Sequence, residues 1–136
     1  MPDGGRAPSL TLILARDLAA SLATPVFIVD AAGDLVFFNE AAEEVLGTTF
    51  AEHQVMSREE WAAAFRPRDE EGRALGVEDL PLGVVLAERR PAHRTIRIVG
   101  GDGVARRIEV TAVPLYARPD EFVGGIALFW ETPAGP

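Results

Sequence analysis

Leucines recur at every fourth position near the start of the chain: Leu10, Leu14, Leu18 and Leu22. A spacing of four places side chains on one face of an α-helix, and Ile13 lies beside that face. Pro25 cannot continue a helix and favours extended geometry at Thr24. The pattern predicts an amphipathic helix over residues 9–22. The preceding segment, 1–8, is rich in glycine and proline and is expected to be flexible.

The pattern then changes from helical to strand-like. β-branched and aromatic residues fill 26–29 and 35–38, so both ranges are predicted to be strands. Asp30 and Gly33 lie between them. Glycine tolerates a positive φ, and an aspartate accepts hydrogen bonds from nearby backbone amides. The two strands are therefore expected to form a hairpin around a tight turn.

The chain's only asparagine, Asn39, follows the second predicted strand directly. Asparagine is a favoured N-cap residue, because its side chain accepts a hydrogen bond from the first turn of a helix. Glu40 and Glu43 come next, where the helix dipole favours acidic side chains, and Gly47 suits the C-cap. A short helix is predicted between Asn39 and Gly47.

Two further helices are predicted in the middle of the chain. Ser57 and Glu60 have the spacing of a capping box, which opens a helix carrying Trp61. Asp79 is predicted to be the N-cap of the next helix, with Pro81 in its first turn.

The last third of the chain has the pattern of β-structure. Three strands are predicted over 95–99, 104–115 and 122–130, and the Gly-Gly-Asp-Gly sequence at 100–103 is typical of a hairpin turn between the first two. The last range is apolar on both faces, so both faces should be covered. The middle helices would form one cover. The N-terminal helix, from the same chain or from a second copy, would form the other.

Three segments now stand in order along the chain: DAAGDLVFFNEAA at 30–42, LPLGVVLAERR at 80–90, and DG…IEVTAVPL…VGGIALF within 102–129. In this order and spacing they resemble the PAS domain family, small α+β sensor modules of signalling proteins. The resemblance covers about 24–131 and leaves 132–136 as a tail. It implies a five-stranded antiparallel sheet, with short helices over one face that enclose a cavity.

The resemblance also implies that the cavity binds a small, mostly apolar ligand. The residues expected to line it are Phe27, Val29, Val45, Leu46, Trp61, Phe65, Leu82, Val85, Leu86, Ile96, Ile98, Ile108, Val110, Ala127 and Phe129. Asp30, Gly33 and Asn39 are expected to shape the local fold. A ligand would shift the population between two packings of the helices, and so move the N-terminal helix or a dimer interface.

A rival hypothesis keeps the fold without a ligand, so that the module only forms a homodimer or docks on a signalling partner. The leucine stripe (Leu10, Leu14, Leu18 and Leu22) bears on this choice. It could cover the sheet of its own chain or form the dimer interface with a second copy. A small α+β enzyme is the third hypothesis.

The residue types restrict the cofactors that the family resemblance would allow. The chain contains no cysteine, which excludes a cysteine-linked chromophore, whether of the light-sensing flavin type or of the photoactive-yellow type. Haem-binding members take their proximal histidine from the helix that matches 80–90, and this segment has none; His53 and His93 lie elsewhere. A non-covalent flavin stays compatible with the sequence, with Trp61 available for stacking.

Charge and motifs restrict the remaining function classes. The net charge of −8 disfavours nucleic acid as a partner, because an acidic surface repels phosphates. No leader pattern and no run of 18 apolar residues is present, so a cytoplasmic protein without a membrane span is expected. No catalytic motif occurs, and the acidic run at 69–71 lacks the spacing of a calcium loop. We therefore expect neither catalytic nor metal-ligating residues.

Overall fold

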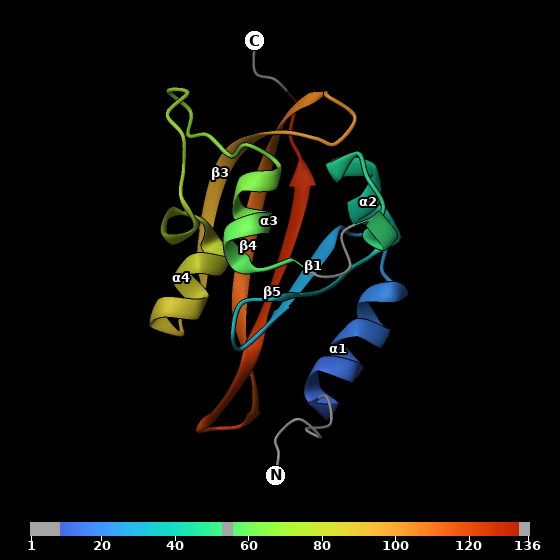
Figure 1. The fold of residues 1–136 in the computed structure, drawn as a ribbon. Coiled ribbons are helices and arrows are strands. Elements are labelled where there is room, and N and C mark those ends of the chain that lie inside the picture. Colours follow the sequence, from blue (N-terminus) through green and yellow to red (C-terminus); the bar gives the residue numbers. More distant parts are fainter. Residues whose placement is uncertain (1–8, 53–55, 134–136) are drawn as a thin grey trace.

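The computed structural model of the chain describes residues 9–52 and 56–133 (Figure 1). The α-helices are α1 (Leu10–Ala20), α2 (Glu40–Leu46), α3 (Arg58–Ala64) and α4 (Pro81–Glu88), and the short 3₁₀ helices are η2 (Phe50–Glu52) and η3 (Val77–Asp79). The strands are β1 (Val26–Asp30), β2 (Leu35–Phe38), β3 (Ala92–Val99), β4 (Ala105–Arg118) and β5 (Glu121–Glu131).

The strands form one five-stranded sheet in the order β2-β1-β5-β4-β3, and every neighbouring pair is antiparallel. This confirms the predicted α+β class and sheet. Side chains alternate between the two faces of a strand. Phe27 and Val29 of β1 therefore belong to the core beneath α2, α3 and α4, whereas Val26 and Ile28 belong to the core beneath α1 (Figure 1).

The β1–β2 connection is a tight turn held by Asp30. Its Oδ1 accepts hydrogen bonds from the amides of Ala32 and Asp34, both at 3.0 Å. Gly33 has φ +93°, a conformation that side-chain-bearing residues rarely adopt. The turn brings β2 back beside β1, and the chain then enters α2.

Asn39 is the N-cap of α2, and its side chain also holds two other segments. Its Oδ1 accepts hydrogen bonds from the amides of Ala42 and Val26, each at 3.0 Å. Its Nδ2 donates to the carbonyl oxygens of Ala19 at 2.8 Å and Thr24 at 2.9 Å. The residue is 1% exposed. One buried amide therefore joins the end of α1, the start of β1 and the start of α2.

The two middle helices begin differently from each other. α3 has the predicted capping box, in which the Ser57 hydroxyl accepts from the amide of Glu60 and the Glu60 carboxylate accepts from that of Ser57. The prediction that Asp79 caps the next helix was wrong. Asp79 ends η3, where its carboxylate accepts from the amide of Gly76 at 3.0 Å, and α4 begins at Pro81 with Leu80 as its N-cap.

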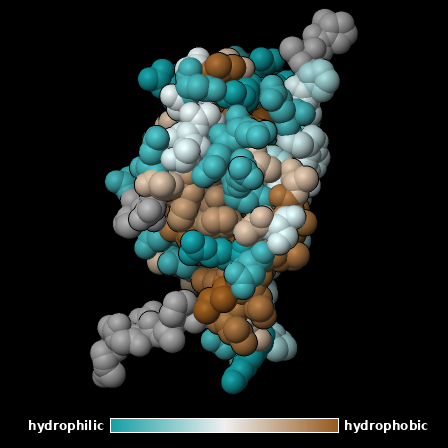
Figure 2. All heavy atoms as spheres, turned by 90° about the vertical axis from the view of Figure 1, so that its right-hand side faces the viewer, coloured by the Kyte–Doolittle hydropathy of each residue, from teal (hydrophilic) through white to brown (hydrophobic). Residues whose placement is uncertain are grey.

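α1 covers the outer face of its own sheet, but not with the leucine stripe. Leu12, Ala15 and Ala19 pack into the core formed with β1 and β5. The leucines of the stripe point away from the sheet: Leu10, Leu14, Leu18 and Leu22 are 69%, 58%, 62% and 37% exposed. Figure 2 faces this side of the molecule and shows hydrophobic side chains gathered toward its lower part. The reading in which the stripe covers its own sheet is therefore wrong.

Candidate functional site

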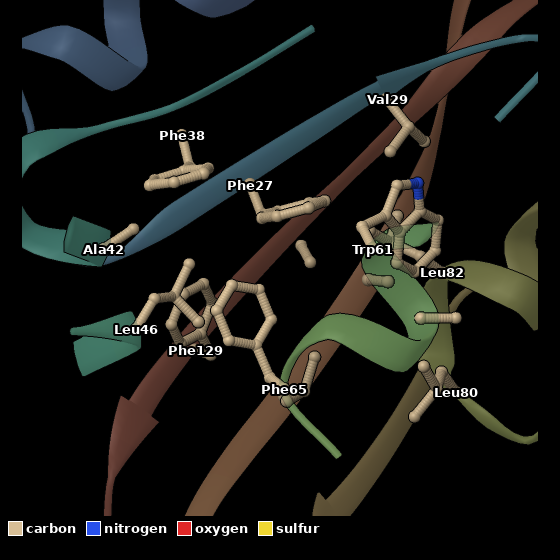
Figure 3. Close-up of a cluster of buried hydrophobic side chains, with 14 of the residues drawn as sticks. Phe27, Val29, Phe38, Ala42, Leu46, Trp61, Phe65, Leu80, Leu82 and Phe129 are labelled. Carbon is tan, nitrogen blue, oxygen red and sulfur yellow. The ribbon is translucent and has the colours of Figure 1, made fainter. Parts of the chain in front are cut away.

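A cavity of about 90 Å³ lies between the helical layer and the inner face of the sheet. Strands β1, β3, β4 and β5 form its floor, and α2, α3, the start of α4 and the loops around them form its cover. The lining residues are Phe27, Leu46, Trp61, Ala62, Phe65, Pro67, Leu80, Pro81, Leu82, Ile96, Ile98, Ile108, Val110, Ala127 and Phe129. Figure 3 shows several of these side chains converging from the strands and from α3.

Most of the residues expected from the sequence to line the cavity do so in the structure. These are Phe27, Leu46, Trp61, Phe65, Leu82, Ile96, Ile98, Ile108, Val110, Ala127 and Phe129. Val29 and Val85 lie in the same core without reaching the cavity, and Val45 and Leu86 are partly buried against that core. The structure adds Ala62, Pro67, Leu80 and Pro81. Three of these four come from loops or a helix start, where hydrophobic periodicity gives no signal.

The aromatic side chains form one connected wall of the cavity. The ring of Phe27 stacks on that of Phe38 with centroids 5.7 Å apart, and Trp61 meets Phe27 edge to face at 5.6 Å. The indole Nε1 of Trp61 donates a 2.7 Å hydrogen bond to the carbonyl oxygen of Gly33. This bond ties α3 to the β1–β2 turn and fixes the orientation of the indole.

The cover is anchored to the sheet by contacts outside the cavity. Gly101 donates a 2.8 Å backbone hydrogen bond to the carbonyl of Leu46, which holds the end of α2 against the β3–β4 turn. In the same turn the carboxylate of Asp102 pairs with Arg106 at 2.8 Å. The Arg106 hydrogen bonds, helped by the amide of Val104, lower the pKa of Asp102 from 3.8 to about 2. The turn therefore keeps its charged form well into the acid range.

The loop that follows α3 passes from the cavity around the edge of β3 to the outer face. Pro67 lines the cavity, and the backbones of Arg68 and Arg97 exchange two 2.9 Å hydrogen bonds at the edge. Glu70 then reaches Arg107 at 2.7 Å and Arg97 at 3.4 Å. The Arg107 hydrogen bonds lower the pKa of Glu70. This loop therefore connects the cavity wall with the outer face of the sheet.

His93, the histidine that the structure describes, does not line the cavity. His93 lies on the outer side of β3, and its Nε2 is 2.7 Å from Oε1 of Glu109. The hydroxyl of Thr95 and then His93 lower the pKa of Glu109 by hydrogen bonding to its carboxylate. His53 lies outside the described residues. Within 9–52 and 56–133, no group of three or more acidic or histidine side chains is placed to hold a metal ion.

The cavity does not fit the larger cofactors considered above. A water molecule needs roughly 10–15 Å³ by this kind of measure, and an engineered apolar cavity that binds benzene has roughly 150 Å³. At about 90 Å³ the cavity is smaller than that benzene site. A flavin, with three fused rings, or a haem would have to displace much of the lining. The space suits a molecule of about one small ring.

The chain matches the family model described as "PAS fold" over residues 15–131. This match spans most of the chain, from the middle of α1 to the last residue of β5. The chain therefore belongs to the PAS fold family, as its sequence resemblance implied. A search of curated proteins finds no match.

Solved structures with the same fold include sensory domains from bacteria and fungi. The PAS domain of Bordetella pertussis BvgS is 17% identical, with a TM-score of 0.61 over 90% of this chain and 86% of that one. The LOV domain of the blue-light activated histidine kinase EL346 from Erythrobacter litoralis is also 17% identical, with a TM-score of 0.63 over 83% and 99%. The light-state dimer of the fungal blue-light photoreceptor Vivid is 10% identical, with a TM-score of 0.66 over 93% and 99%.

At these identities the likeness shows the fold alone, and together with the family match it supports a signalling sensor module. No helix among the described residues is both long enough and apolar enough to cross a membrane.

Proposed function

We propose that this domain is a non-enzymatic sensor of the cytoplasm whose cavity binds a small, mostly apolar molecule. The observation that carries the proposal is the cavity itself, an apolar space of about 90 Å³ that remains between the cover and the sheet. Protein interiors are otherwise packed with few voids larger than a water molecule. A retained space of this size at the centre of a sensor fold favours a ligand over simple core packing.

Ligand binding would be read out through the cover. α2, α3 and the loop after α3 all contribute lining residues, and each is tied by hydrogen bonds to a different part of the sheet. A ligand that prefers one packing of these segments shifts the equilibrium toward that packing. A differential affinity of about 1–3 kcal/mol is the range in which such coupling is effective. The change in packing would then be transmitted to the outer face of the sheet, to α1 or to a bound signalling protein.

The test is to fill the cavity with Ala127→Leu. Ala127 is 3% exposed and lines the floor of the cavity on β5, so the three added carbons occupy the ligand space. A panel of small apolar and polar compounds is screened by thermal unfolding. Compounds that bind the wild type raise its midpoint. The same compounds should leave the midpoint of Ala127→Leu unchanged.

Ala64→Leu is the matched control, because it adds the same side chain to an exposed position on α3. It should keep the response of the wild type. Ala62→Val is a milder cavity filler if Ala127→Leu overpacks the core and fails to fold. The proposal fails if no compound stabilises the wild type more than the filled variants, or if the filled variants bind as well as the wild type.

A second candidate function, dimerisation through α1, rests on the exposed leucine stripe. The opposite side of α1 is already occupied by its own sheet through Leu12 and Ala19, so the stripe is left for another molecule. A stripe of identical apolar side chains is suited to an isologous contact with a second copy. Vivid, with the same fold, forms a light-state dimer. Dimerisation and ligand binding are compatible, since the dimer would carry the output of the cavity.

A further inference from the structure

We propose that the cavity selects uncharged hydrocarbons of about one small ring and rejects analogues that carry a hydroxyl, carboxylate or phosphate group. This inference deepens the proposed function and rests on it. It concerns the chemistry of the ligand, which follows from the polar groups of the described residues in and around the cavity.

Among the lining residues that the structure describes, Trp61 alone has a polar side-chain atom, since the others are phenylalanine, leucine, isoleucine, valine, alanine or proline. That atom is already engaged, because the indole N–H donates to the carbonyl oxygen of Gly33 at 2.7 Å. The backbone groups of the floor are paired between the strands β3, β4 and β5. A guest with a hydroxyl therefore meets no free side-chain donor or acceptor among the described lining residues.

The buried polar residues elsewhere in the described chain are also fully engaged. They are Asn39 and Asp69. The side chain of Asn39 bonds to the segments around α1, β1 and α2. The carboxylate of Asp69 accepts from the amides of Glu71 and Arg73 at 2.9 and 2.8 Å. Neither residue lines the cavity, so neither can turn to meet a polar guest.

None of the described residues that line the cavity is a cation, and the arginines that flank it already have partners: Arg94 donates to the carbonyl oxygen of Asp79 at 3.1 Å. Arg97 and Arg107 are on the outer face and pair with Glu70, and Arg106 pairs with Asp102 in the β3–β4 turn. An ionised carboxylate buried without a partner is strongly disfavoured. The cavity should therefore exclude fatty acids and phosphate-bearing cofactors for the same reason that it excludes alcohols.

Size and shape narrow the class further. The volume of about 90 Å³ falls between that of a water site and that of an apolar cavity known to take benzene. Phe27, Phe65, Phe129 and Trp61 lie around this space (Figure 3). Aromatic rings in such a wall offer faces and edges for offset or edge-to-face contact with a guest ring. The space therefore sets a six-membered ring, or an alkane chain of similar bulk, as the upper limit for a guest.

The test compares benzene with phenol, which differs from it by one hydroxyl, and with benzoate, by isothermal titration calorimetry in sealed cells. Wild-type protein should bind benzene at least tenfold more tightly than phenol, and benzoate should give no measurable binding. Val110→Thr places a hydroxyl in the lining with little change in shape. This substitution should lower the preference for benzene over phenol, measured as the ratio of the two affinities, at least threefold. Val113→Thr is the control and should leave the ratio unchanged, because Val113 does not line the cavity and is paired in register with Ile126 of the core beneath α1.

The outcomes separate the ligand class from the existence of a binding site. If phenol or benzoate binds as tightly as benzene, the proposed hydrocarbon class is wrong. If that binding is lost in Ala127→Leu, the ligand still occupies the cavity and the proposed function stands. Benzene binding that persists unchanged in Ala127→Leu would place the guest elsewhere and overturn the inference. If benzene does not bind but polar members of the wider panel do, the inference also fails and the sensor proposal survives.

Discussion

Asn39→Ala is expected to lower the free energy of unfolding by about 3–4 kcal/mol. Each buried polar group that loses its partner costs roughly 1–3 kcal/mol, and hydrogen bonds to water offset part of this cost. The substitution removes the acceptor for the amides of Val26 and Ala42 and the donor for the carbonyls of Ala19 and Thr24. Urea unfolding followed by circular dichroism measures the loss. A loss below about 1 kcal/mol, the usual value of a simple N-cap, would contradict the threefold role of this side chain.

Asn39→Asp separates the N-cap from the other contacts. Aspartate is as good an N-cap as asparagine and keeps an oxygen for the amides of Val26 and Ala42. Its second oxygen, however, replaces the amide nitrogen and faces the carbonyl oxygens of Ala19 and Thr24 at distances near 2.9 Å in the wild type. We expect Asn39→Asp to lose most of the stability that Asn39→Ala loses. Wild-type stability in the aspartate variant would show that α1 is not held through this residue.

The double substitution Leu14→Glu/Leu18→Glu is expected to convert a dimer into a monomer. Both leucines are more than half exposed at 58% and 62%, so the change should cost the monomer little stability. In a dimer the same positions would bury acidic side chains against their own copies, which is strongly unfavourable. Sedimentation velocity over a range of concentrations measures the oligomeric state, and circular dichroism verifies the fold.

Ala20→Glu is the control for the dimer experiment, because it adds an acidic side chain to the same helix away from the leucine stripe, at an exposed position. It should keep the oligomeric state of the wild type. A dimer that survives in Leu14→Glu/Leu18→Glu would exclude the helix-mediated interface. A wild-type protein that stays monomeric at high concentration would do the same, and would leave the leucine stripe to a different partner.

The parts of the fold that the sequence predicted well are those fixed by local chemistry. The turn at Asp30 and Gly33, the capping box at Ser57 and the hairpin at 100–103 each depend on residues close together in the chain. The strands also followed from their pattern, although β3 begins three residues earlier and β4 ends three residues later than expected. Asp79 shows the limit of such signals. Its carboxylate accepts a hydrogen bond from the backbone amide of Gly76 at the start of η3. An N-cap of α4 would accept the same kind of hydrogen bond, so the residue type alone does not tell the two positions apart.

The misjudged features depend on contacts between distant residues. Periodicity placed the leucines on one face of α1, but it could not tell that Leu12, Ala15 and Ala19 would face the sheet instead. The small alanines give no strong hydrophobic signal, yet Ala19 lies completely buried in the core beneath α1. Pro67 likewise lines the cavity in a loop that distant contacts hold at the edge of β3, since the next residue, Arg68, exchanges backbone hydrogen bonds with Arg97, 29 positions along the chain. No local pattern encodes that pairing.

The most direct test of the sensor account is a titration with benzene followed by the methyl resonances of the folded protein. The account predicts that the methyl signals of lining residues such as Ala62, Val110 and Ala127 shift and saturate together. The methyl signals of Leu12 and Val123, which lie in the core beneath α1, should stay in place apart from small transmitted changes. Lining signals that do not move, while those of exposed leucines on α1 do, would show that the apolar surface binds and that the cavity is only a packing void.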